Sequence, residues 1–232
     1  MYEGENNNQS VIDDLCLSNI QGQPPFPLFF SSTKFVAAQI PGINANETIL
    51  VDLAASNPKP ANCILSIIAY ERKFVKSIEF LRTQILPKVK NSQYQELDGD
   101  YMLKLTVLCM NHKKLLVALD KVLSNPKDII LNFINVLVDQ PNLVSAHAEY
   151  YRRFLQDEAI AADFSTQYSE EFSSSIGGKT IIQLMKSSNQ WIEFINKTSL
   201  ELASNLSNEF QDQKSRLIQF ASLMNMIMTT VK

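Results

Sequence analysis

A single carboxylate interrupts the most regular apolar pattern in this chain. Between Cys63 and Leu86 the apolar residues recur every three or four positions, which predicts one face of a helix. Glu71 lies four residues after Ile67 and three before Phe74, so its carboxylate falls on this face or at its edge. Burying a carboxylate without a partner is costly. We therefore expect Glu71 either to pair with a lysine or arginine inside the fold or to lie at a surface where another molecule binds.

The only two histidines, His112 and His147, lie on different predicted helices. Neither has a cysteine, aspartate or glutamate near it at the spacing of metal ligands, so no metal site is predicted. His112 falls on the apolar face of its helix, and we expect it to be a hydrogen-bonded core or groove residue rather than a ligand.

The three cysteines, Cys16, Cys63 and Cys109, have apolar surroundings and form no CxxC pair. An odd and sparse set of this kind is typical of a reducing compartment. Their expected burial disfavours a Cys–His catalytic pair, because a buried thiol is a poor nucleophile. No catalytic residue is therefore predicted.

One segment partly matches a phosphate-binding loop. Gly178-Lys179-Thr180 fits the end of the GxxxxGK[ST] motif, but Ser173 occupies the position of the required first glycine. No predicted strand precedes the segment. We therefore interpret it as an ordinary loop, and we expect no nucleotide or other cofactor.

The composition narrows the class of protein. The chain has 232 residues, a net charge of −3 and only 6 glycines. The absence of a basic bias disfavours binding to nucleic acid. No run of 18 apolar residues predicts a transmembrane segment, and the polar first ten residues lack the apolar core of a secretory signal. We therefore expect a cytoplasmic protein.

The pattern of apolar runs predicts an all-α fold, an elongated helical bundle with a small N-terminal extended or hairpin segment. The N-terminal arm comprises residues 1–60, rich in proline and partly disordered by its composition, and the bundle comprises residues 61–232. The predicted helices span residues 61–86, 101–123, 127–138, 143–164, 181–195 and 198–231. Pro87 is expected to end or kink the first of them.

The last predicted helix shows a sevenfold spacing of apolar residues. Ala203, Phe210, Leu217, Met224 and Val231 are separated by seven positions each. Such a helix packs along its whole length, and an exposed seam of this kind would dimerise. This pattern supports one functional alternative, a non-catalytic helical scaffold or a trafficking or membrane adaptor.

The region around Glu71 also resembles a known family. The pattern resembles the first conserved block of Dbl homology (RhoGEF) domains. In that block a glutamate is followed by an aromatic residue three positions later, by valine four positions later, and by aliphatic residues seven and ten positions later. The matching residues here are Glu71, Phe74, Val75, Ile78 and Leu81. The family's second helix is similar to His112-Lys-Lys-Leu115-Leu116 of this chain. The next segment of the family is similar to Ile129–Phe133, followed by Tyr150 and Tyr151, and its third block loosely resembles Ser215–Met224. The resemblance covers about residues 61–232.

The resemblance implies a guanine-nucleotide exchange factor that binds the switch regions of a Rho-family small GTPase and promotes GDP release without covalent chemistry. It implies Glu71 as the residue that holds the first switch segment, with Lys214 and Arg216 as further GTPase-binding residues. Where the third block of the family opens with Lys-Pro-Val, this chain has Asp212-Gln213-Lys214. The family also continues one helix beyond the position of Lys232. We therefore expect a divergent domain or one truncated at its C-terminus.

Overall fold

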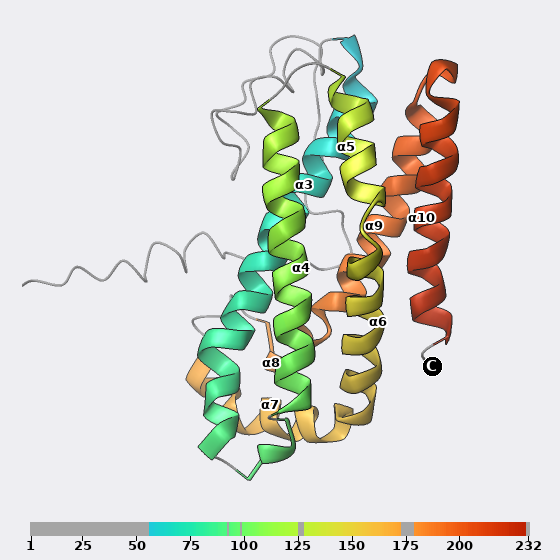
Figure 1. Ribbon diagram of the computed structural model, residues 1–232. Coiled ribbons are helices and arrows are strands. Elements are labelled where there is room, and N and C mark those ends of the chain that lie inside the picture. Colours follow the sequence, from blue (N-terminus) through green and yellow to red (C-terminus); the bar gives the residue numbers. More distant parts are fainter. Residues whose placement is uncertain (1–55, 92, 98, 125–127, 173–178, 231–232) are drawn as a thin grey trace, which may run out of the picture.

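The computed structural model describes residues 56–91, 93–97, 99–124, 128–172 and 179–230 (Figure 1). The predicted N-terminal hairpin falls within residues 1–55 and lies outside this part of the chain. Eight α-helices and no strands are found among the described residues, which confirms the predicted all-α fold.

The first two helices of the bundle begin close to their predicted positions. α3 spans Pro58–Phe80 and follows Asn57, with Pro58 in the first turn, where a missing N–H costs nothing. The α-helical backbone ends earlier than predicted, and a π-helical turn, Leu81–Ile85, and a 3-10 turn, Leu86–Asn91, carry the chain past Pro87. α4 spans Asp100–Leu123 and agrees with the prediction.

α3 and α4 run antiparallel. Arg72 pairs with Asp120 late in α4, whereas Glu79, the penultimate residue of α3, contacts Cys109 earlier in α4. The start of α3 therefore lies at the same end of the bundle as the end of α4 (Figure 1). α5, Ile129–Val138, and α6, Pro141–Gln156, then pack against α4.

The single helix predicted over residues 143–164 is wrong, because the structure has two. α6 ends at Gln156, and α7 spans Glu158–Phe172 across the end of the bundle at which α4 begins (Figure 1). Asp157 separates them, with its side chain bound by Arg153 Nε at 2.6 Å. No proline or glycine marks this break, so packing of α7 against the bundle, rather than local sequence, accounts for it.

The last two predicted helices are also divided differently. The helical segments are α8, Ile181–Met185, α9, Ser187–Asn205, and α10, Gln211–Thr230, with a 3-10 turn at Asn208–Phe210. The predicted break near residue 196 is wrong, and the chain turns at Leu206 and Ser207 instead. Asn205, Ser207 and Asn208 favour helix ends and were a signal for this turn.

The sevenfold seam is consequently split between α9 and α10, which pack against each other. Of the seam residues, Ala203, Leu217 and Met224 are buried within the chain, as are Phe220 and Ile227 between them and after them on α10. α10 also contacts α5 and α6. An exposed seam was the condition for dimerisation, and these residues do not meet it, because α9 and α10 pack against each other. No described helix is by itself long and apolar enough to cross a membrane; only α5 and α6 taken together, bent by 43°, meet that test.

Candidate functional site

Glu71 lies in the centre of the bundle with both carboxylate oxygens bound. His112 Nδ1 is 2.7 Å from Oε1, and Trp191 Nε1 donates to Oε2 at 2.7 Å. The side chain of Glu71 is 1% exposed and that of His112 is fully buried. Of the two placements left open by the sequence, the structure therefore has Glu71 paired inside the fold, with a histidine and a tryptophan in place of a lysine or arginine.

The polar contacts continue from His112 through a second histidine. His112 Nε2 lies 2.9 Å from His147 Nε2, and His147 Nδ1 lies 2.7 Å from Ser188 Oγ. Burial, together with the nearby charge of His112, lowers the pKa of His147 well below its usual range. His147 is therefore neutral, and one of its ring nitrogens carries the proton.

Two proton arrangements satisfy every contact in this chain of residues. In the first, His147 donates from Nε2 to a neutral His112, and Ser188 donates its hydroxyl proton to His147 Nδ1. In the second, His112 carries two protons and donates to both Glu71 and His147, which then donates from Nδ1 to Ser188. The network can therefore hold one extra proton without leaving a buried nitrogen unpaired.

Aromatic rings enclose the network. His147 stacks on Trp191 with ring centroids 4.5 Å apart, and Phe74 meets His112 edge to face at 4.4 Å. The rings belong to four helices, α3, α4, α6 and α9, so the network fixes how these helices meet. The expectation that His112 is a hydrogen-bonded core residue is confirmed.

Sequence reasoning missed His147, Ser188 and Trp191 as members of this network. A signal for His147 was present, because Leu143, Tyr150 and Phe154 place it on the apolar face of its helix by the same spacing that placed His112.

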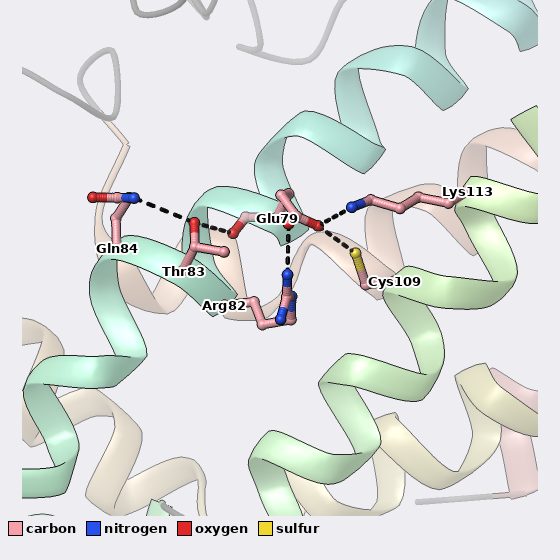
Figure 2. A network of polar contacts seen from close by, with 6 residues as sticks. All are labelled: Glu79, Arg82, Thr83, Gln84, Cys109 and Lys113. Carbon is pink, nitrogen blue, oxygen red and sulfur yellow. Dashed lines mark hydrogen bonds and ion pairs between the residues drawn. The ribbon is translucent and has the colours of Figure 1, made fainter. Parts of the chain in front are cut away.

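A second polar cluster surrounds Glu79 between α3 and α4 (Figure 2). Arg82 donates to Oε1 at 2.6 Å, while Lys113 at 2.7 Å and the Cys109 thiol at 2.9 Å share Oε2. Burial raises the pKa of Glu79, but the three donors outweigh it and lower that pKa to about 2. Burial, and then the bond to Glu79, raise the pKa of Cys109 to about 11, so its thiol is protonated and unreactive.

The predicted GTPase-binding residues do not come together in one site. Lys214 and Arg216 lie on α10, where Arg216 binds Asp139 at 2.7 Å and Asn135, and so connects α10 to α5. α9 packs against both α3 and α10 and separates the network of Glu71 from these residues. The three side chains therefore cannot contact one partner segment together in this arrangement.

The loop that partly matched a phosphate-binding motif leads into α8. Residues 173–178 lie outside the described part of the chain. Thr180 caps α8 and accepts a hydrogen bond from Gln183 N at 3.3 Å, while the Gln183 side chain accepts one from Thr180 N at 2.8 Å. In a phosphate-binding loop the hydroxyl at this position would bind the metal ion of the nucleotide. Here the Thr180 hydroxyl instead caps α8.

The described residues contain no group of three or more histidine, cysteine, aspartate or glutamate side chains placed to hold a metal ion. Comparisons of the chain with models of known protein families, with curated proteins and with solved structures found no match.

Proposed function

We propose that this chain acts by binding another protein, a small GTPase of the Rho family, and that binding promotes release of GDP. The observation that carries the proposal is the burial of the side chains most able to do chemistry. Glu71, His112 and His147 are each at most 1% exposed. Burial, with a smaller contribution from Glu201, raises the pKa of Cys63 to about 12. Groups that a substrate cannot reach do not serve as acid, base or nucleophile, which favours action through the surface.

The class of partner is inferred from the residues that resemble the first block of Dbl homology domains. These residues, Glu71, Phe74, Val75, Ile78 and Leu81, lie on α3 and the turn that follows it, within an all-α bundle. Exchange needs no bond to be made or broken in the protein. It needs a surface that binds the nucleotide-free GTPase more tightly than the GDP-bound form.

The burial of Glu71 changes its role in this proposal. Because His112 and Trp191 occupy both of its oxygens, Glu71 positions α3 against α4 and α9 and does not itself hold a segment of the GTPase. The GTPase contacts would instead come from the exposed side of α3, where Lys76 lies one turn beyond Arg72. Cations at the rim of an apolar interface improve its specificity and its rate of association.

A non-catalytic scaffold is the second candidate function, and one observation favours it. α4 exposes four large apolar side chains on a surface that the described residues leave open, and such patches mark contacts with other molecules. A scaffold binds its partner without changing the rate at which a GTPase loses nucleotide.

The test measures release of fluorescent GDP from a panel of Rho-family GTPases in the presence of the full chain. The proposal predicts that at least one GTPase releases nucleotide about 10-fold faster, a reduction of ~1.4 kcal/mol in the barrier. Lys76→Glu should remove most of this effect. Lys59→Glu, an exposed lysine in the first turn of α3, is the matched control and should retain it.

Binding of a GTPase without faster release would support the scaffold candidate instead. If no GTPase in the panel binds the chain and none releases nucleotide faster, the exchange proposal is overturned. Glu71→Ala is a poor choice for this assay, because the loss of its two buried hydrogen bonds would destabilise the whole bundle.

A further inference from the structure

One face of α4 is apolar and uncovered by the described part of the chain. Leu103, Val107, Met110 and Val117 are 58%, 41%, 53% and 56% exposed. Their separations of four, three and seven positions place them in one line along the helix. We call this line the α4 stripe. Soluble proteins seldom leave an apolar line of this length without a partner.

The α4 stripe is also cationic at one end. Lys114 and Lys121 continue the same line toward the end of α4, and a shallow surface hollow is lined by both, with Lys113, Val117 and Ala118. Lys113 pairs with Glu79, but among the described residues no carboxylate lies within ion-pair distance of Lys114 or Lys121. α4 itself has no acidic residue between Tyr101 and Leu119. An occupant that suits this face is therefore apolar and negatively charged.

We propose that the occupant is the chain's own N-terminal segment, residues 10–20. Residues 1–33 contain four carboxylates, Glu3, Glu5, Asp13 and Asp14, and no lysine or arginine. Within the segment, Val11, Ile12, Leu15 and Cys16 have the spacing of one side of a helical turn, with the two aspartates beside them. The segment thus has apolar side chains that can pack on the α4 stripe. It also has the negative charge that the lysines of the stripe lack as a partner.

The point of attachment makes this contact reachable. Because α3 and α4 are antiparallel, the chain that precedes Ser56 enters the bundle at the end of α4 where Lys121 lies (Figure 1). The linker of residues 21–55 has a root-mean-square span of roughly 30–35 Å if it behaves as a flexible coil. The linker is attached at Ser56, 16 residues before Arg72, which pairs with Asp120. At the rise of an α-helix, Val117 therefore lies about 29 Å from the attachment point and Leu103 about 50 Å. Val117 is within the root-mean-square span of the linker, and Leu103 is within its extended length of roughly 115 Å.

Attachment through the linker also lowers the affinity that is needed. A tethered segment experiences an effective concentration on the order of 1 mM, so even an intrinsically weak contact is substantially occupied. A second copy of the chain suits the face less well, because its α4 stripe carries no carboxylate that could pair with Lys114 or Lys121. The inference does not depend on the proposed exchange activity, since it concerns the free chain.

The test uses the natural Cys16 as a reporter in the full chain. Val117→Cys places a thiol on the α4 stripe. Ser204→Cys is the control and places a thiol on the exposed side of α9. Ser204 lies at the same end of the bundle, because Glu201 of α9 lies near Cys63 at the start of α3. The rate of intramolecular disulfide formation with Cys16 under mild oxidation is then measured by peptide mass mapping. Cys63 and Cys109 compete little, because both are buried and protonated.

The proposal predicts that the disulfide forms about 10-fold faster at position 117 than at position 204, because docking raises the local concentration beyond that of the linker alone. Asp13→Lys with Asp14→Lys should slow the reaction at position 117 by about 5-fold and leave position 204 unchanged. Lys114→Glu with Lys121→Glu should slow it similarly, and the combined charge swap should restore it.

Equal rates at positions 117 and 204 would overturn the proposal, as would rates at position 117 that do not respond to charge reversal. Disulfides between two chains through position 117 would overturn it in favour of a second copy as the occupant. Because Val117, Ser204 and the two lysines are exposed, these substitutions leave the core intact.

Discussion

Replacing Glu71 with alanine removes the acceptor of two buried hydrogen bonds, from Trp191 Nε1 and His112 Nδ1. A buried donor left without a partner costs about 1–3 kcal/mol, and the two donors stay enclosed by aromatic rings. The two donors together therefore cost about 2–6 kcal/mol. We expect Glu71→Ala to lower the free energy of unfolding by this amount, and Tm by roughly 4–24 °C for a chain of this size.

Glu71→Gln separates the hydrogen bonds from the loss of volume. The amide oxygen can still accept from one donor, but the amide nitrogen then faces the other donor, so about 2 kcal/mol should be lost. Glu193→Gln is the matched control, because Glu193 is exposed on α9 two residues after Trp191, and it should change stability by less than about 0.5 kcal/mol.

Urea unfolding followed by fluorescence reports on this site directly, because Trp191 is the only tryptophan in the chain. A loss below about 1 kcal/mol for Glu71→Ala, similar to a surface substitution, would refute the argument that the network stabilises the bundle. If Glu71→Gln and Glu193→Gln lower the free energy of unfolding equally, the conclusion that Glu71 accepts hydrogen bonds from both Trp191 and His112 is refuted.

Two further predictions concern ionisation. Burial and the charge of His112 lower the pKa of folded His147, so the unfolded chain binds this proton more readily. The contribution of His147 to stability should therefore be constant above about pH 7.5, and below about pH 6.5 it should fall by up to ~1.4 kcal/mol per pH unit. Urea unfolding between about pH 5.5 and 7.5 checks this, and a flat profile would contradict it. Glu79→Gln should lower the pKa of Cys109 from about 11 and speed its alkylation several-fold. Cys63 in the same molecule is the control, and an equal increase at both thiols would indicate general loosening instead.

The helical periodicity of the sequence predicted much of the fold. The repeats near Ile67 and Leu105 gave the two long helices α3 and α4 close to their observed starts, because the spacing of apolar residues is a local property. The breaks at Asp157 and Leu206 were missed. No proline or glycine lies at either position. The break at Asp157 depends on contacts such as that with Arg153. The turn at Leu206 had a local signal in Asn205, Ser207 and Asn208, which was missed because the apolar spacing continues through it.

By itself the sequence determined that Glu71 and His112 lie on the apolar faces of two helices. Only the tertiary structure decided that they meet, and that Trp191, 120 positions from Glu71, completes the contact. The physical reason is that periodicity fixes which side of a helix is buried, whereas helix packing fixes which side chains face one another across the core. The same distinction separates the seam of α10, which packing fills, from the α4 stripe, which the described helices leave open.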